Sequence, residues 1–349
     1  MGVSGTWSFL NSKDIKGVKS NDIQRYSERV YFQKTIHIDL VGAFYNSIRR
    51  NFLNVREKDE RKKLSAAHRL LAEIHTVVNK KNCILYIDGK PTLERDFAHT
   101  NRLESLLSTQ ETLEKEIEAY NESHTKARHK TIMFLARKLF RVSPDIESTI
   151  VYAAQQTGWR IVVAEGEAEV EIGRVGGIVL TQDSDMLFYP KVDTVICPFD
   201  GAYRFYNKST ILSELGLSNE FFTVMGIVAK NDYDQDFYAE EKSENDRDFH
   251  KNRMNEIYKE LVVIEKESFN VRNLTGSSLI KVILKAYVSF MNAKTGKDVG
   301  VDAYQSSYSI FALQQEQPLL EAYDPRSYDI NRPATYLDMI HNYQPRYDY

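Results

Sequence analysis

Short apolar runs alternate along the first 235 residues with longer segments in which apolar positions recur every three or four residues. The short runs are typical of strands and occupy residues 35–39, 83–87, 159–163, 178–180, 194–198 and 202–206. The longer segments are typical of amphipathic helices, as in residues 55–80, where one face carries Leu64, Ala67, Leu71, Ile74 and Val78. Strands that alternate with helices indicate an α/β fold with a mainly parallel sheet flanked by helices.

Further helical patterns occupy residues 40–50, 145–157, 210–215, 219–229 and 277–292. Residues 103–141 contain few helix breakers and many charges, which predicts one or two long helices. Residues 234–255 are dense in mixed charge and predict an exposed loop, and the last thirty or so residues, rich in Tyr and Pro, predict an irregular tail. We therefore expect an α/β part in residues 1–235 and a helical C-terminal part with this tail in residues 236–349.

Acidic residues follow several of the predicted strands. They are Asp39, Asp88, the pair Glu167 and Glu169, and the pair Asp183 and Asp185, while Asp232 closes an apolar helix. Open α/β sheets bind ligands at the carboxyl ends of their strands, so these acids predict one acidic pocket. Carboxylates that converge repel each other unless a cation lies between them, and oxygen ligands without thiolate or imidazole favour Mg²⁺ or Mn²⁺. An ordinary acidic surface stays open as the alternative, because 49 of 349 residues are acidic.

A stripe of basic residues lies within the predicted long helices. Lys126, Lys130, Arg137 and Arg141 are spaced by four, seven and four, which places them along one helix face. Such a stripe can follow a phosphate backbone, and a solvated helix face explains the spacing equally well.

The composition and charge of the chain limit the kinds of partner and the location that we expect for it. The chain is 42% hydrophobic and 27% charged with a net charge of −3, so contacts with nucleic acid must come from local basic patches. No apolar run approaches the roughly 20 residues of a membrane span, and no secretory signal opens the sequence. Cys83 and Cys197 lie in apolar stretches without metal-ligand spacing. We expect an intracellular monomer, in the nucleus or cytoplasm, that is not secreted and has no membrane partner.

Six short motifs resemble those of the flap endonuclease family, the Rad2-like structure-specific 5′ nucleases related to the xeroderma pigmentosum group G nuclease. In chain order they are MGVSGTWSFL at the N-terminus, IHID ending at Asp39, YIDGKPTLERDFAHTNR around Asp88, AEGEAEVE, TQDSD and KNDY. Each motif is weak alone, but all occur in the family's order with every expected acid present. The resemblance covers residues 1 to about 235.

The resemblance implies a PIN-like fold and a metal-dependent phosphodiesterase. Two Mg²⁺ ions about 4 Å apart, which Mn²⁺ can replace, would orient a water and stabilise the attacking and leaving oxygens. The acids that would hold them directly or through water are Asp39, Asp88, Glu167, Glu169, Asp183, Asp185 and Asp232. Residues 103–141 take the place of the family's helical arch, through which a single strand passes, and the basic stripe fits that role.

Four further residues acquire roles from the same resemblance. Arg95 and Arg102 match the basic pair that polarises the scissile phosphate, with Arg in place of the family's first Lys. Tyr45 matches the aromatic residue on which a base beside the cut stacks, a contact worth about 1–3 kcal/mol. Gly2 matches the small N-terminal residue near the active site.

The sequence also departs from the family pattern. Glu165 replaces a proline, and Lys230 replaces a glycine before the Asp232–Tyr233 pair. The Gly-rich hairpin that should follow Tyr233 and grip duplex DNA is replaced by DQDFYAEEKSENDRD, which is acidic and has no glycine. Preference for a 5′ flap therefore does not carry over, and RNA, single strands and other junctions stay open, with DNA favoured over RNA.

Two further hypotheses compete with an active nuclease. The first is a nuclease-like scaffold that binds RNA or proteins, which the changed segment after Tyr233 and the Tyr-rich tail favour. The second is a phosphatase or other α/β hydrolase that uses acids and Mg²⁺. It leaves the arch-like helices and the N-terminal motif unexplained.

Overall fold

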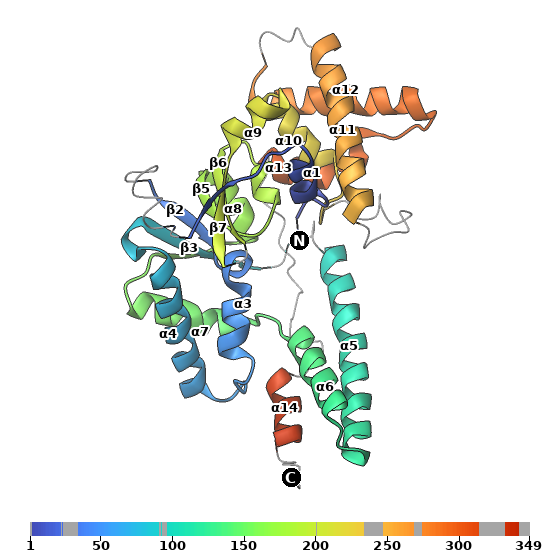
Figure 1. The fold of residues 1–349 in the computed structure, drawn as a ribbon. Coiled ribbons are helices and arrows are strands. Elements are labelled where there is room, and N and C mark those ends of the chain that lie inside the picture. The colour runs from blue at the N-terminus through green and yellow to red at the C-terminus, as the bar shows by residue number, and fades with distance from the viewer. Residues whose placement is uncertain are drawn as a thin grey trace. The chain divides into compact units, whose positions relative to one another are not determined.

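The computed structural model describes residues 2–21, 23, 34–90, 92, 96–199, 201–233, 247–268, 274–313 and 332–341. The chain forms two compact units and passes between them several times (Figure 1). The first unit comprises Met1–Ala43, Asn82–Ala98 and Val162–Leu320, and the second comprises Phe44–Lys81, His99–Ile161 and Glu321–Tyr349. The functional division expected near residue 235 stays a prediction.

Among the described residues, seven strands form one sheet in the order β1-β7-β6-β5-β2-β3-β4. They are β1 Val18–Ser20, β2 Ile36–Asp39, β3 Cys83–Ile87, β4 Ile161–Val163, β5 Gly177–Leu180, β6 Val192–Phe199 and β7 Ala202–Asn207. Pairing is parallel between β3 and β2, β2 and β5, and β5 and β6, whereas β7 is antiparallel to both β6 and β1. The predicted α/β class is confirmed, and all six predicted strands are present, with β1 as an addition.

Strand β2 lies at the centre of the parallel part and fixes the register of its neighbours. Ile38 lies opposite Leu85 of β3 on one side and Leu180 of β5 on the other, and all three side chains are fully buried. Strands buried on both faces are expected to be continuous in apolar residues. Because the three strands are parallel and in register, the residues that follow Ile38, Leu85 and Leu180 reach the same edge of the sheet.

The helices of the first unit cover residues both before and after position 235. They are α1 Thr6–Ser12, α8 Ala168–Val175, α9 Lys208–Leu215, α10 Asn219–Val228, α11 Arg247–Ser268, α12 Gly276–Thr295 and α13 Gln305–Phe311. Helix α1 packs against α11, and α10 packs against α11, α12 and α13. No single helix in the described part of the chain is long and apolar enough to cross a membrane, although α9 and α10, bent by 88°, pass such a test as a pair.

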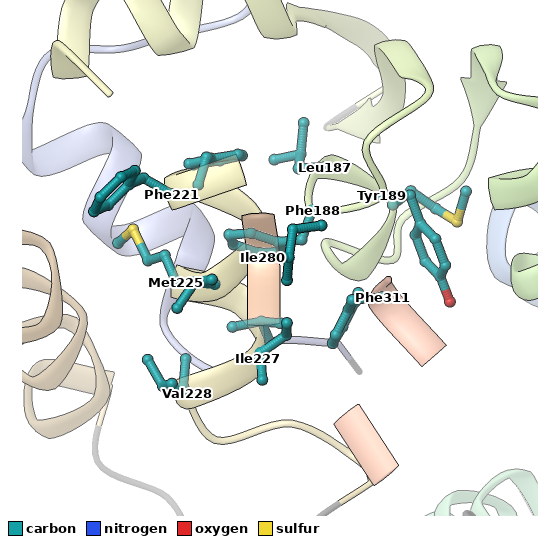
Figure 2. Close-up of a cluster of buried hydrophobic side chains, with 14 of the residues drawn as sticks. Leu187, Phe188, Tyr189, Phe221, Met225, Ile227, Val228, Ile280 and Phe311 are labelled. Carbon is teal, nitrogen blue, oxygen red and sulfur yellow. The ribbon is translucent and has the colours of Figure 1, made fainter. Parts of the chain in front are cut away.

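One aromatic cluster joins the sheet side of this unit to its C-terminal helices (Figure 2). Phe188 stacks on Phe222 of α10 with ring centroids 4.7 Å apart. Phe311 of α13 lies 5.3 Å from the ring of Tyr189 and 6.3 Å from that of Phe188. Burying a large side chain of this kind stabilises the fold by about 1.5–3 kcal/mol. Residues beyond position 235 therefore complete the same core as the sheet.

The second unit is helical. It contains most of α3 Leu40–Phe52, α4 Glu60–Val77, most of α5 Asp96–Glu122, α6 Lys126–Leu139, α7 Pro144–Gln156 and α14 Pro333–His341. Helices α5 and α6 confirm the long helical segment predicted for residues 103–141, and the Thr125 hydroxyl caps α6 by accepting from the Arg128 N–H. Helix α14 packs on them, and the Tyr336 hydroxyl donates to Glu114 of α5 at 2.8 Å.

Two predictions of irregular structure are wrong in part. Residues 247–255, expected to be a loop, begin α11, because Met254 starts a buried stripe that continues with Ile257, Leu261 and Ile264. Residues 333–341 of the expected irregular tail form α14, because Tyr336, Leu337 and Ile340 bury against α5 and α6. Apart from Arg332, the rest of both segments lies outside the described residues.

Two finer predictions also need correction. Gly173, Gly176 and Gly177 predict a small turn from the sequence, but Gly173 is part of α8. An added Cβ at Gly173 would lie 2.3 Å from the Tyr189 ring, so this glycine permits close packing. In residues 277–292 the sequence pattern predicts an inward face formed by Leu279, Val282, Ile283, Ala286 and Phe290. The structure buries Ile283 as expected, but it buries Ile280 and Leu284 more deeply than Leu279 and Val282. The α12 pattern is apolar over more than one face, so periodicity alone misplaced its centre by one residue.

A buried lysine on α9 gives the first testable prediction. Lys208 donates from Nζ to the Tyr189 carbonyl at 2.7 Å, and burial lowers the pKa of its ammonium to about 7, although Asp193 and Glu220 act in the opposite direction. Between pH 7 and its ordinary pKa of about 10.5, the unfolded chain binds this proton and the folded protein does not, so stability rises with pH. We expect the unfolding free energy of the wild type minus that of Lys208→Met to increase by up to about 2.7 kcal/mol from pH 7 to pH 9.

Urea denaturation of both proteins at each pH measures this difference, because other titrating groups cancel in the subtraction. A difference that stays constant or falls over this range would contradict a depressed Lys208 pKa.

Candidate metal centre

A chain of hydrogen bonds links the carboxyl ends of β2 and β5. Asp39 ends β2, and its carboxylate accepts from the Gly42 N–H and from the Thr181 hydroxyl, each at 2.9 Å. The Thr181 hydroxyl in turn accepts from the Asp183 N–H at 3.0 Å, and the Asp183 carboxylate accepts from the Asp185 N–H at 3.1 Å. The strand pairing thus brings three predicted acids to one place, where hydrogen bonds orient the side chains of Asp39 and Asp183.

The negative charges of Asp88 and Asp183 act on the carboxyl group of Asp39. The pKa of Asp39 is raised to about 7, first by burial, then by the negative charge of Asp88 and, less strongly, of Asp183. The bonds from Gly42 and Thr181 act in the opposite direction. A carboxylate whose charge is disfavoured in this way gains stability when a cation is bound nearby.

Glu167 and Glu169 reach the same unit from the start of α8. Glu167 is the N-cap of α8, and Asp88 accepts from the Ala168 N–H at 2.8 Å, which ties the end of β3 to this helix. Both oxygens of Glu167 accept hydrogen bonds, one from the Thr92 hydroxyl at 2.8 Å and one from the Tyr233 hydroxyl at 3.0 Å. The Tyr233 hydroxyl also contacts Glu169, and both glutamates are buried.

Three carboxylates come close enough to share one ion. Oxygen atoms of Glu169, Asp183 and Asp185 all lie within 4.8 Å of one another, with Glu169 and Asp185 buried and Asp183 half-buried. Asp185 is fully buried. A Mg²⁺ ion binds oxygen at about 2.1 Å, so ligands on opposite sides of it are about 4.2 Å apart. The donor set and its spacing therefore fit a hard divalent cation.

Asp232 lies in a turn that the C-terminal helix α13 holds in place. The Asn231 side chain accepts from the Tyr233 N–H at 2.9 Å and from the Ser307 hydroxyl at 3.0 Å. The Tyr233 ring meets Phe311 edge-on at 5.9 Å. Asp232 is half-buried and is not among the three acids that lie within 4.8 Å of one another.

The N-terminus passes beside Asp183. The Val3 carbonyl accepts from the Ser184 hydroxyl at 3.2 Å, and the Ser4 N–H donates to the Lys230 carbonyl at 2.8 Å. A Cβ built on Gly2 would lie 2.2 Å from the Asp183 Oδ1 atom, closer than any real contact. Gly2 therefore lies against one of the three clustered carboxylates.

The other predicted site residues belong to the second unit or lie outside the described residues. Tyr45 is half-buried, and its hydroxyl donates to the Phe140 carbonyl at 2.7 Å. Lys126, Lys130 and Arg137 are exposed on α6, whereas Arg141 follows the end of that helix and is half-buried. Arg102 is half-buried on α5, and Arg95 lies outside the described residues. Their roles stay predictions.

Several residues that build this centre were not assigned a role from the sequence. Thr181 and Tyr233 stand inside the TQDSD and KNDY motifs, so their positions carried a signal that attention to the acids alone overlooked. Thr92 and Asn231 also stand inside quoted motifs, whereas Ser307 carries no such signal, because its contact with Asn231 joins segments 76 residues apart.

Among known proteins, the chain is weakly similar to solved structures of one catalytic core. No protein-family model matches the sequence, and neither does any curated protein. Two solved structures of the catalytic core of Rad2 in complex with DNA substrate are 12–13% identical, with TM-scores of 0.39, and a third, also of the Rad2 core, has a TM-score of 0.36. The two substrate complexes cover 88% of this chain and 98% of their own. At this level of similarity, the α/β class rests on the strand order and pairing.

The hydrogen bonds of the Tyr233 hydroxyl allow a test of whether a cation binds near Glu167 and Glu169. Hydrogen bonds to charged groups are worth about 1.5–3 kcal/mol, so Tyr233→Phe should lower the unfolding free energy by about that amount in EDTA. In saturating Mg²⁺ the deficit should shrink, because a cation would stabilise Glu167 and Glu169 in place of the lost donor. Urea denaturation with and without Mg²⁺ measures both values.

Tyr258→Phe is the matched control, since the Tyr258 hydroxyl donates to the neutral Leu215 carbonyl at 2.9 Å. Its deficit should be about 1 kcal/mol and should not depend on Mg²⁺. A Tyr233→Phe deficit that is equal in both buffers would contradict a cation site at these glutamates.

Proposed function

We propose that the chain is a divergent nuclease of the flap endonuclease type, with a PIN-like core, that hydrolyses phosphodiester bonds in DNA with the help of Mg²⁺. Its substrate is a branched or single-stranded DNA, with RNA as the second choice. One observation carries the proposal: acids that follow β2, β3 and β5 and that open α8 accept hydrogen bonds at one edge of the sheet, and Glu167, Glu169 and Asp185 among them are buried. Acidic surfaces that arise from composition alone do not bury their carboxylates in this way.

In this proposal Glu169, Asp183 and Asp185 hold the metal, and Asp39, Asp88, Glu167 and Asp232 complete the site directly or through water. The metal, when bound, supplies Lewis-acid polarisation of the phosphate and a nucleophilic water at neutral pH. Thr181 and the Gly42 N–H orient the Asp39 carboxylate, and Thr92 and Tyr233 orient Glu167. Without a cation, these acids repel the phosphate backbone, so activity is strictly metal-dependent.

Further residues supply positive charge and stacking in the same proposal. Arg95 and Arg102 polarise the scissile phosphate, where the planar guanidinium group offers paired donors. Tyr45 stacks on a base beside the cut. Lys126, Lys130, Arg137 and Arg141 bind the backbone of a single strand.

A substrate panel tests the proposal. Purified protein with its native N-terminus is incubated with labelled flap DNA, gapped DNA, single-stranded DNA and structured RNA, with Mg²⁺ or with EDTA. We expect cleavage of at least one DNA only with Mg²⁺. No cleavage of any of them would overturn the proposal, as would cleavage that persists in EDTA.

A nuclease-like scaffold is the second candidate, and one observation favours it. The Tyr233 hydroxyl lies between Glu167 and Glu169 and donates to this pair, so a group of the protein itself stabilises the two carboxylates. Calorimetric titration with Mn²⁺ separates the candidates. If the chain is a scaffold, Asp183→Asn should leave any Mn²⁺ binding unchanged. If it is a nuclease, Asp183→Asn should abolish Mn²⁺ binding.

A further inference from the structure

Helices α5 and α6 differ sharply in charge. Residues 103–122 of α5 contain six Glu residues and one Lys, whereas residues 126–141 contain six Lys and Arg residues and no acid. The two helices share one apolar cluster with α14. Attraction for a polyanion is therefore stronger on residues 126–141 than on residues 103–122 of α5.

Helix α6 has a buried face and an exposed face. Ile132, Leu135, Ala136 and Leu139 are buried in the cluster with α5 and α14. Phe134 lies on the opposite side of the helix, and its exposed fraction is 57%. A Phe at the centre of a solvent face loses the stabilisation that burial provides, and its ring is accessible to a ligand.

Cations surround this aromatic ring. Lys130 and Lys138 lie one turn before and after Phe134, about 6 Å along the helix in each direction, and Arg137 lies on the adjacent ridge. All three are exposed, and the Lys138 ammonium lies 4.7 Å from the centre of the Phe134 ring. Within the described residues, these three cations form no ion pair, whereas Arg128 pairs with Glu116 at 3.4 Å.

We propose that Phe134 is a stacking platform for a base of a single-stranded nucleic acid that runs along α6, with Lys130, Arg137 and Lys138 binding the phosphates on either side. An aromatic face flanked by cations suits single strands, because their bases are free to stack while the backbone follows the charges. The bases of a duplex are paired and stacked on one another, so none of them is available to stack on this ring. The inference rests on the proposed nuclease function and deepens it by naming the aromatic side chain on which a base of that strand stacks.

A protein-docking face is the competing explanation, and the chemistry of α6 disfavours it. Protein interfaces have an apolar centre depleted in Lys, whereas the exposed face of α6 carries one aromatic ring among three cations. The aromatic residue also distinguishes the surface from an ordinary solvated face, for which charge alone suffices.

Fluorescence anisotropy of the full chain with a labelled 12-nucleotide single-stranded DNA, in EDTA, tests the inference. We expect Phe134→Ala to bind at least about fivefold more weakly and Phe134→Trp to bind as tightly as the wild type, because stacking needs only an aromatic face. The dependence of binding on salt should be unchanged in Phe134→Ala. In Lys130→Ala the slope of log affinity against log salt should fall by about 0.7, the value for one lost phosphate contact with a single strand.

Tyr152→Ala is the matched control, since Tyr152 is an aromatic residue on α7 with an exposed fraction of 54%. It should bind as tightly as the wild type. Equal binding by Phe134→Ala and the wild type, absence of any binding by the wild type, or full binding by Phe134→Leu would overturn the inference. The last of these outcomes would indicate an apolar contact of the kind that a protein partner makes.

The binding and cleavage assays fail independently. Loss of all cleavage with Phe134-dependent binding intact would sink the proposed nuclease alone. Metal-dependent cleavage by a protein whose DNA binding ignores Phe134 would sink this inference alone.

Discussion

Asp183→Ala should lower the rate of DNA cleavage at least about 1,000-fold, a loss of about 4 kcal/mol of transition-state stabilisation. Asp183 belongs to the cluster of three carboxylates, and its side chain also holds the Asp185 N–H, so its removal disturbs two of the three candidate ligands. Single-turnover cleavage in Mg²⁺ measures the rate. Binding of the same DNA in EDTA should be retained or strengthened, because the variant removes one negative charge from the site.

Two variants make this result specific. Asp183→Asn keeps the shape of the side chain and an oxygen that accepts from Asp185, so an equal loss of cleavage would assign the effect to charge. Asp193→Ala removes an exposed carboxylate that pairs with Lys34 at 3.7 Å, and its cleavage rate should be unchanged. Cleavage by Asp183→Ala at the wild-type rate would show that the catalytic centre lies elsewhere.

Gly2→Ala should lower the cleavage rate about 100-fold. The added Cβ would lie 2.2 Å from the Asp183 Oδ1 atom and 2.6 Å from the Ser184 hydroxyl, so one of these groups must move. A displacement of a reacting geometry by about 1 Å costs on the order of 100-fold in rate. Steady-state cleavage with mass spectrometry of both proteins, which establishes that they share the same N-terminus, provides the measurement.

Gly201→Ala is the control for backbone strain. Gly2 has a φ of 110°, and Gly201 has a φ of 69° with nothing within 4 Å of an added Cβ. Gly201→Ala therefore introduces the strain of a left-handed alanine, about 1 kcal/mol, without a clash. Its cleavage rate should match the wild type. Equal rates for Gly2→Ala and Gly201→Ala would contradict the placement of Gly2 against Asp183.

The strands of the parallel sheet were predictable because burial on both faces leaves a compact apolar signature. The run CILYI was predicted and observed as β3 with the same bounds, and the acid after it lies where the parallel register places it. The acids were predictable for a related reason. The residue after a parallel strand always reaches the same edge, so one-dimensional order translates directly into proximity.

The C-terminal part was predicted less well because its order depends on partners distant in sequence. Helix α14 is short and is fixed by Tyr336 and Leu337 packing on α5 and α6. Likewise, the contact between Ser307 and Asn231 spans 76 residues, and no local pattern announces it.

A crystal grown with MnCl₂ tests the central claim most directly, because manganese scatters anomalously and its position is then observed rather than inferred. We expect an anomalous peak among the carboxylates of Glu169, Asp183 and Asp185, with Mn–O distances of about 2.2 Å, similar to those of Mg²⁺. A well-ordered crystal with all three carboxylates in place and no manganese among them would contradict the account.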